Sequence, residues 1–333
     1  NGSTVDVQAG YIQQTWLKGP DGRLYEVSRA PGDILYSGFY KGFEYTSKRW
    51  GQTEYYYNPL IAPRERSEGA YTVGRDAGRL VVSTASAVLE GQVVGDTYQG
   101  ERQTQAAQKG LDGYLQSQKA VARGAQFVVG SYVPYYVKDS ATLQYALGAD
   151  ASTVKNVVLG QRAAAIAAGL DLTTALPADR VSTLYLDTDA LNATELGTIK
   201  IASTGSILVN GALEVAAAGD ITLFAPKIEV NANLTAHSGS LQLGNVQTQI
   251  TPAGKVDVTL GGRGSLTVNN GVSLDASGLW SNQRLGTGDG SRLPYLNGGS
   301  VALRSSGDMT LAAGSQVDVS SGAALDAKGQ LTG

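Results

Sequence analysis

A run of short segments between Leu196 and Gly278, with aliphatic residues at every second position, constrains the fold of this chain most. In a strand, alternate side chains share one face, so each segment places a pair of aliphatic side chains on the same side. Segments this short are stable only when they stack on similar segments. Lys255-Val-Asp-Val258 is a further segment of this kind. The expected inward pairs are Ile199/Ile201, Ile207/Val209, Leu213/Val215, Ile221/Leu223, Ile228/Val230, Leu241/Leu243 and Leu266/Val268.

The spacing of these segments indicates a structural repeat. Gly197, Gly219 and Gly239 open similar segments, with separations of 22 and 20 residues. A period of about 20 residues is typical of leucine-rich repeats and of parallel β-helices. The fixed Leu/Asn signature of a leucine-rich repeat is absent from the sequence. The pattern therefore predicts an all-β chain that forms a parallel β-helix (β-solenoid), with one or two short helices.

Composition and charge narrow the classes of function. The chain has 43 glycines and only 17% charged residues, which suits many tight turns. It has no cysteine, so disulfides and thiolate chemistry are excluded. A net charge of −3 and a pI near 5.3 argue against a nucleic-acid partner. No apolar run reaches the eighteen or so residues of a membrane span, so we expect none.

A short motif recurs at three places. It reads Gly2-Ser-Thr-Val-Asp-Val-Gln-Ala-Gly10, Gly271-Val-Ser-Leu-Asp-Ala-Ser-Gly278 and Gly314-Ser-Gln-Val-Asp-Val-Ser-Ser-Gly322. We expect Asp6, Asp275 and Asp318 to occupy equivalent positions. Solvated or turn-bonding carboxylates are the favoured interpretation, because short polar side chains commonly bond neighbouring backbone groups.

After two of these motifs the chain departs from the repeat and later resumes it, which indicates insertions outside the β-helix. A segment rich in helix formers also lies within 96–127, and we expect a short helix over Tyr114 to Ala122. Because the chain opens at Asn1 on a strand-like motif, we expect it to be a piece of a longer protein. The predicted organisation is β-helix at 1–10, 78–95, 128–278 and 298–333, an aromatic-rich insertion at 11–77, a loop and helix insertion at 96–127 and a loop at 279–297.

The insertion at 11–77 contains most of the aromatic residues of the chain. Its segments Ile34 to Tyr40 and Gln52 to Tyr57 have the β-propensity to form a hairpin or small sheet. The rings either pack as a small core against the β-helix or form a patch that contacts carbohydrate or protein, because Tyr and Trp combine apolar area with a polar group. The candidate ligand-binding residues are Tyr40, Tyr45, Trp50, Tyr55, Tyr56 and Tyr57.

We predict no catalytic residues, no metal site and no cofactor. His237 is the only histidine and lies in a predicted turn, so a Ser-His-Asp triad would depend on that residue. Asp187 and Asp189 flank one residue of a predicted strand and therefore share a face, which leaves calcium binding open. Polysaccharide lyases and hydrolases also use β-helices. They need clustered carboxylates, and the sequence does not space any pair by whole repeats.

Three features together resemble the filamentous haemagglutinin-type exoproteins of bacterial two-partner secretion. They are the recurring Gly-Ser-x-Val-Asp-Val motifs, the restart Gly298-Gly-Ser-Val-Ala-Leu303, and Leu186-Asp-Thr-Asp-Ala-Leu-Asn192 leading into Gly197-Thr-Ile-Lys-Ile201. The resemblance implies a right-handed parallel β-helix, export through an outer-membrane transporter, and a role in adhesion or biofilm at the cell surface. The secretion domain of that family carries an Asn-Pro-Asn motif, whereas this chain has only Asn58-Pro-Leu-Ile61, so that role is not carried over.

The expected function is that of a non-enzymatic adhesin segment that is secreted or exposed at the bacterial surface, in association with the outer membrane. The expected partners are the two-partner-secretion transporter during export and a glycan or protein of a host or bacterial surface. Exposed β edges at the ends of a β-helix also predict weak end-to-end self-association. The alternative is a β-helical protein that binds or degrades polysaccharide.

Overall fold

A computed structural model gives the structure of the chain. It describes residues 4–332 except 8–9, 15, 27–29, 32–38, 41–42, 48, 51, 57–63, 69, 110–114, 137–142, 167, 169–170, 172, 252–253, 283–288 and 327. The chain divides into two compact units. Unit 1 contains residues 1–4, 74–105 and 121–333, and unit 2 contains residues 5–73 and 106–120. Strands are the main regular secondary structure in both units.

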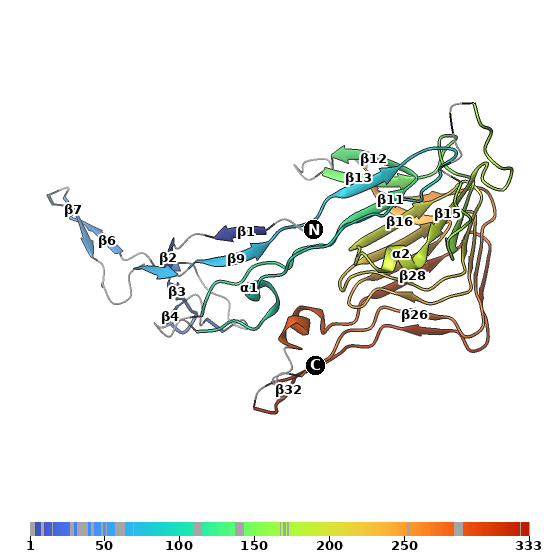
Figure 1. Ribbon diagram of the computed structural model, residues 1–333. Coiled ribbons are helices and arrows are strands. Elements are labelled where there is room, and N and C mark those ends of the chain that lie inside the picture. The colour runs from blue at the N-terminus through green and yellow to red at the C-terminus, as the bar shows by residue number, and fades with distance from the viewer. Residues whose placement is uncertain are drawn as a thin grey trace. The chain divides into compact units, whose positions relative to one another are not determined.

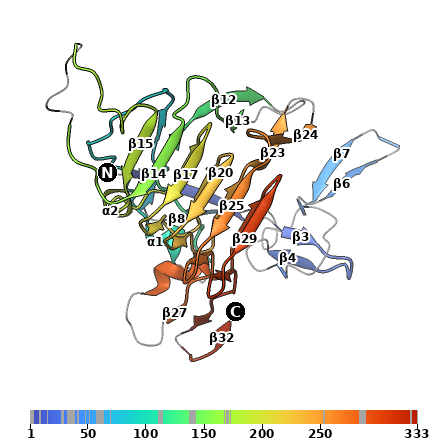
Figure 2. The ribbon, with the colours of Figure 1, turned by 90° about the vertical axis from the view of Figure 1, so that its right-hand side faces the viewer.

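Three parallel sheets form the body of unit 1 (Figure 1). Figure 2 shows the strands of the second sheet side by side in their order. In sheet order, the first sheet contains β10 (Arg79–Val82), β11 (Gln126–Val129), β16 (Thr198–Ala202), β19 (Asp220–Phe224), β22 (Ser240–Gly244) and β28 (Ser300–Arg304). The second contains β15 (Thr183–Asp187), β14 (Asn156–Gly160), β17 (Ser206–Val209), β20 (Lys227–Val230), β25 (Ser265–Val268) and β29 (Asp308–Leu311). The third contains β18 (Leu213–Glu214), β21 (Leu234–Thr235), β26 (Ser273–Asp275) and β30 (Gln316–Asp318).

From β16 to β22 the chain visits the first, second and third sheets in turn and then returns to the first. We call one such passage a cycle. Successive cycles are in register, so Ile199 pairs with Ile221 and Ile221 with Leu241. The restarts predicted at 78–82 and 298–303 are confirmed as β10 and β28, which pair in parallel with β11 and β22.

The core of unit 1 consists of stacked aliphatic side chains. Every inward pair predicted from the sequence is buried, with Ile199, Ile221 and Leu241 each 0% exposed. The equivalent side chains of the last described cycle are open to solvent, since Leu311 pairs with Val268 yet is 48% exposed. The alternation of the sequence therefore defines the core, and each cycle buries the aliphatic side chains of its neighbours.

A column of glycines lies immediately before the strands of the first sheet. An added Cβ at Gly219 would lie 2.4 Å from the carbonyl oxygen of Gly197, and one at Gly239 would lie 1.9 Å from that of Gly219. The same carbonyl groups accept hydrogen bonds from the next cycle, Asp220 N–H to Gly197 O at 3.0 Å and Ser240 N–H to Gly219 O at 2.9 Å. Glycine is required here by the close approach of two backbones, so the glycine spacing marks true neighbours.

Asparagine side chains form a second column, at the turn after the second sheet. The amide nitrogen of Asn231 donates to the amide oxygen of Asn210 at 2.9 Å, and that of Asn269 donates to Asn231. In the backbone the N–H groups of Asn231 and Asn269 donate to Val209 O and Val230 O. Side chains and backbone therefore both connect successive cycles at this corner.

Two antiparallel hairpins leave the parallel sheets. β12 (Ser131–Tyr136) pairs with β13 (Leu143–Gly148), and β23 (Val246–Thr251) pairs with β24 (Gly254–Thr259). Leu147 and Val258 of these hairpins pack with Val128, Ala202 and Phe224 of the first sheet. Lys255-Val-Asp-Val258 therefore belongs to a hairpin, and the expectation that it forms a repeat strand is wrong.

Polar contacts attach the second hairpin to the first sheet. Arg304 of β28 donates to Asp257 Oδ2 at 2.7 Å and to the Thr248 hydroxyl at 2.6 Å. The Gln249 amide also donates to Leu147 O of the first hairpin, at 2.5 Å. The two hairpins therefore form one outer layer over the sheet.

The helical segments differ from those that we expected. α1 covers Glu101–Thr104, α2 covers Thr188–Asn192 and the 3-10 helix η3 covers Asp289–Tyr295. The described residues 115–122 contain no helix, so the helix predicted over Tyr114 to Ala122 is wrong where the structure describes it. β27 (Ser281–Asn282), β31 (Ala324–Leu325) and β32 (Leu331–Thr332) form a small separate sheet.

Unit 2 contains small sheets of short strands. β2 (Gly10–Gln14) pairs with β8 (Arg64–Glu68), and β3 (Trp16–Lys18) lies between β4 (Leu24–Glu26) and β5 (Phe39–Tyr40), all antiparallel. β6 (Phe43–Thr46) and β7 (Thr53–Tyr56) form a further antiparallel hairpin. The β structure predicted for Ile34 to Tyr40 and Gln52 to Tyr57 is confirmed at Phe39–Tyr40 and Thr53–Tyr56, which belong to different sheets. Residues 34–38 and 57 lie outside the described residues.

The recurring aspartate motif is confirmed at two of its three places. Asp275 and Asp318 are direct partners in β26 and β30. β1 (Thr4–Val7), which contains Asp6, instead forms a two-stranded sheet with β9 (Tyr71–Gly74). The expectation that Asp6 is equivalent to the other two is therefore wrong, because so short a strand motif does not specify its partner.

Candidate functional site

The predicted aromatic residues lie on several strands of unit 2. Tyr45, Tyr55 and Tyr56 are brought together in the backbone of the β6–β7 hairpin, where Tyr56 pairs with Phe43 and Tyr55 with Glu44. Tyr40 lies in another sheet, opposite Trp16 of β3. Tyr57 lies outside the described residues. The predicted set is therefore only partly gathered into one hairpin.

Trp50 is the predicted ligand-binding residue whose side chain the structure describes. It lies in the connection between β6 and β7 and is 72% exposed. The guanidinium carbon of the neighbouring Arg49 is 5.1 Å from the centre of its ring. A solvent-open indole beside a cation can stack on a sugar ring or contact a protein surface.

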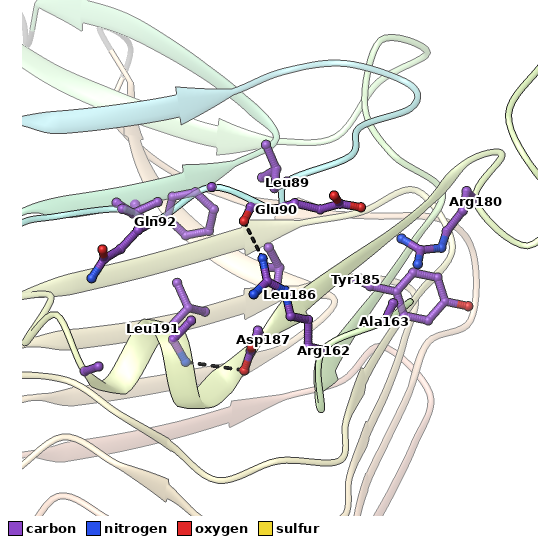
Figure 3. Close-up of a pocket in the computed structure, with 15 residues that line it drawn as sticks. Leu89, Glu90, Gln92, Arg162, Ala163, Arg180, Tyr185, Leu186, Asp187 and Leu191 are labelled. Atoms are coloured by element: carbon purple, nitrogen blue, oxygen red, sulfur yellow. Dashed lines mark hydrogen bonds between the residues drawn. The ribbon is translucent and has the colours of Figure 1, made fainter. Parts of the chain in front are cut away.

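A pocket of about 280 Å³ lies in unit 1, where β15, α2 and the segments around residues 89–93 and 162–163 meet (Figure 3). Strand alternation directs Leu184 and Leu186 of β15 into the core. Asp187 then ends the strand and caps α2, since its Oδ1 accepts from the N–H groups of Asp189 and Ala190 at 3.1 and 3.3 Å. The helix buries Leu191, which is 6% exposed.

The apolar part of the pocket comes from the end of the core. Phe127, Leu186 and Leu191 line it and belong to the main aliphatic cluster, against which Val93 also packs. Leu89 completes this apolar lining. The pocket is therefore a gap between the first strands of the core and the segment that passes over them.

Charged side chains surround the apolar lining. Arg162 Nη2 donates to the Glu90 carbonyl oxygen at 2.6 Å, and the Glu90 carboxylate accepts from Ile166 N–H at 2.7 Å. The Arg180 side chain is only 8% exposed, donates to Ala164 O at 2.6 Å and lies 4.8 Å above the Tyr185 ring. Figure 3 shows Arg162 reaching Glu90 while Arg180 lies over Tyr185.

These contacts also change the interpretation of Asp187 and Asp189. Asp189 lies on α2 rather than on a strand, so the expectation that both carboxylates share a strand face is wrong. The strand ends at Asp187 because its carboxylate binds the first N–H groups of the helix. Across the part of the chain that the structure describes, no group of three or more His, Asp or Glu side chains could hold a metal ion.

His237 has a serine and an aspartate beside it, but the geometry does not form a catalytic triad. Its Nδ1 lies 3.3 Å from the Ser277 hydroxyl and 3.8 Å from Asp275 Oδ1. It also lies 3.1 Å from the Ser277 carbonyl oxygen. A triad requires the serine at one ring nitrogen and the carboxylate at the other. Here both approach the same nitrogen, so the imidazole cannot relay a proton between them.

A cation and aromatic cluster on the first hairpin was not predicted. The rings of Tyr132 and Tyr145 stack with centres 4.8 Å apart, and the Arg79 guanidinium carbon lies 4.1 Å from the centre of Tyr145. Lys200 Nζ lies 5.9 Å from the centre of the Tyr132 ring, and burial lowers the pKa of the Lys200 ammonium group. The alternation of Ser131 to Tyr136 signals a strand, yet nothing in it indicates a hairpin over the sheet. The cluster attaches this hairpin to the first sheet, since Arg79 of β10 and Lys200 of β16 contact its half-buried rings.

Comparisons with family models, with curated proteins and with solved structures found no match to this chain. Among the helices of the described residues, none has the length and apolar character that a membrane crossing requires.

Proposed function

We propose that unit 1 is a right-handed parallel β-helix and that the chain is a non-enzymatic segment of a secreted or surface-exposed bacterial adhesin. The observation that carries this proposal is the in-register stacking of parallel strands over a continuous aliphatic core. Such a stack lengthens by about 4.8 Å with each cycle, so it suits a protein that must extend from a surface. The handedness and the export route rest on the resemblance to filamentous haemagglutinin-type exoproteins.

Adhesion is favoured over catalysis by where the exposed functional groups lie. Trp50 presents an open indole on a connection outside the parallel sheets. The one histidine is held by groups that all approach a single nitrogen. Three of the described carboxylates are engaged in structural contacts, Asp187 by helix N–H groups, Asp257 by Arg304 and Asp318 by Ser320. These contacts suit structural side chains rather than a paired acid and base.

The proposed partners follow from this role. During export the partner is an outer-membrane two-partner-secretion transporter, and at the surface it is a glycan or protein of a host cell or of another bacterium. The protein then acts outside the cell, in association with the outer membrane, in adhesion, biofilm formation and virulence. It needs no cofactor for this function.

A binding assay with matched tryptophan variants tests the proposal. Beads coated with the protein are applied to host cells and bacterial biofilm, and the labelled protein is applied to a glycan array. Trp50→Ala is compared with Trp280→Ala, because Trp280 is similarly exposed, at 60%, but belongs to unit 1. We expect Trp50→Ala to reduce binding at least tenfold and Trp280→Ala to leave it unchanged.

Two results would contradict this proposal. If the unsubstituted protein binds no cell, biofilm or glycan, the adhesion proposal is wrong. If both variants lose binding equally, Trp50 is not the specific contact. Release of unsaturated or reducing sugar ends from polysaccharides incubated with the protein would instead establish the alternative, a β-helical polysaccharide-degrading enzyme.

A further inference from the structure

The pocket beside α2 has properties that the proposed adhesin function does not require. Its apolar lining belongs to the core, yet the pocket retains about 280 Å³ of open volume. Protein interiors normally leave few voids larger than a water molecule. A volume near the lower end of the range for ligand pockets, about 300 Å³, suits a ligand with one ring or a short carbon chain.

The charged groups of the pocket differ in the groups that they contact. Glu90 and Asp187 each accept from backbone N–H groups, Ile166 for the first and Asp189 and Ala190 for the second. Arg162 donates one hydrogen bond, to the Glu90 carbonyl oxygen. Within the described part of the chain, no carboxylate forms an ion pair with Arg162.

The lack of an ion-pair partner for Arg162 among the described residues indicates the sign of the charge that the pocket favours. A guanidinium has five N–H donors, so Arg162 retains donors after its bond to Glu90. Arg180 adds a second positive charge that is almost fully buried, with its nearest carboxylate, Asp179, at 3.5 Å. A cation would meet two arginines and two carboxylates that are already bonded. An anion would meet the unused donors of Arg162.

From these observations we infer that the pocket binds a small carboxylic acid with an apolar body, an aromatic or short aliphatic acid whose carboxylate contacts Arg162 and whose carbon body lies against Phe127, Leu186 and Leu191. The contact is charge-assisted, because a guanidinium and a carboxylate match in geometry. The apolar lining excludes a fully hydroxylated ligand, because its hydroxyl groups would lose water without gaining partners. The inference is independent of the adhesin proposal.

Phenylacetate and hexanoate are the probes, and phenylethanol and hexanol are their uncharged counterparts. Binding is measured by saturation-transfer NMR and by methyl chemical-shift changes at Leu186, Leu191 and Val93. We expect the acids to bind with a Kd on the order of 1 mM or tighter, which is reasonable for ligands of this size. Loss of one charge-assisted hydrogen bond corresponds to roughly tenfold or more in affinity, so the alcohols are expected to bind about tenfold more weakly.

Three variants separate binding from folding. Arg162→Gln should weaken phenylacetate to the level of phenylethanol, whereas Arg263→Gln, a surface change in another part of unit 1, should have no effect. Ala190→Trp fills the pocket from an exposed position of α2 and should abolish binding of both probes. Circular dichroism that matches the unsubstituted protein shows that each variant is folded.

The inference is overturned if neither acid binds at 10 mM, on the order of ten times the expected Kd. It is also overturned if acids and alcohols bind equally, if Arg162→Gln leaves phenylacetate binding unchanged, or if folded Ala190→Trp still binds both probes.

Discussion

Replacing Gly239 by alanine adds one methyl group at the tightest point of the glycine column. The new Cβ would lie 1.9 Å from the Gly219 carbonyl oxygen and 2.9 Å from its carbonyl carbon. The carbonyl would have to retreat by about 1.1 Å to reach even the shortest separation that real Cβ atoms show, 3.0 Å. The same oxygen accepts from Ser240 N–H at 2.9 Å, so this movement breaks a hydrogen bond between cycles.

The expected cost follows from these two effects. An unsatisfied buried acceptor costs about 1–3 kcal/mol, and overpacking typically costs about 1–3 kcal/mol more. We therefore expect Gly239→Ala to lower the free energy of unfolding by roughly 2–6 kcal/mol. The midpoint of thermal unfolding should fall by roughly 5–15 °C, since 1 kcal/mol corresponds to a few degrees in a domain of this size.

Gly262→Ala is the matched control. An added Cβ at Gly262 meets nothing within 4 Å, and the φ of this residue lies outside the left-handed region. Alanine in such a position usually stabilises by about 0.4–1 kcal/mol, because the unfolded chain loses conformational freedom. Urea and thermal unfolding of both variants are followed by circular dichroism. Equal midpoints for Gly239→Ala and Gly262→Ala would refute the close approach of the two backbones.

Three further perturbations address the core, the asparagine column and the second hairpin. Leu241→Ala truncates a fully buried side chain and should lower the free energy of unfolding by about 2–5 kcal/mol. Leu311→Ala truncates a side chain that is 48% exposed and should lower it by less than about 1 kcal/mol, as measured by urea unfolding of both variants. Equal costs would contradict the assignment of the core. Asn231→Ala removes its donation to Asn210 and its acceptance from Asn269, and should lower stability by about 1–2 kcal/mol, more than Asn297→Ala, whose side chain is exposed. If Asn231→Ala lowers the free energy of unfolding no more than Asn297→Ala does, the asparagine column does not contribute to stability. Arg304 and then Thr248 hold the pKa of Asp257 below its ordinary value of 3.8. The stability that this pair contributes is therefore present above pH 3.8 and lost as the pH falls through the lower folded pKa. The hydrogen-exchange rates of the β23–β24 backbone amides should therefore differ between Asp257→Asn and the unsubstituted protein at pH 6. They should become equal below the folded pKa of Asp257. A difference in exchange rate that persists at that low pH would contradict the ion pair.

The repeat and its core were predictable because their determinants are local in the sequence. An aliphatic pair such as Ile221/Leu223 specifies which face of the strand is buried, and Gly197, Gly219 and Gly239 specify the spacing. The same pattern did not reveal which alternating segment leaves the parallel sheets. Lys255-Val-Asp-Val258 alternates as the repeat strands do, yet it pairs antiparallel with β23.

The pocket was beyond sequence reasoning for a different reason. Its members Glu90, Arg162 and Asp187 are far apart in the chain. Arg162 and Asp187 meet because β14 and β15 lie side by side at the end of the second sheet, and Arg162 binds the Glu90 carbonyl oxygen. The chain also forms the helix α2 after Asp187, where we expected the strand to continue. The short polar segment Thr188–Asn192 does not by itself indicate a helix. Among the predicted aromatic residues, Trp50 is exposed to solvent, and its role in binding stays a prediction.

The strands of the first sheet meet across very different lengths of chain. The register partners Thr198, Asp220 and Ser240 follow one another after 22 and 20 residues, whereas Gln126 precedes Thr198 by 72 residues and Ser300 follows Ser240 by 60. Closing the longer connections costs about 1 kcal/mol more entropy each. Folding is therefore expected to nucleate at β16, β19 and β22 and to propagate outward, so the residues that adopt their structure last are those nearest the two ends of the sheet.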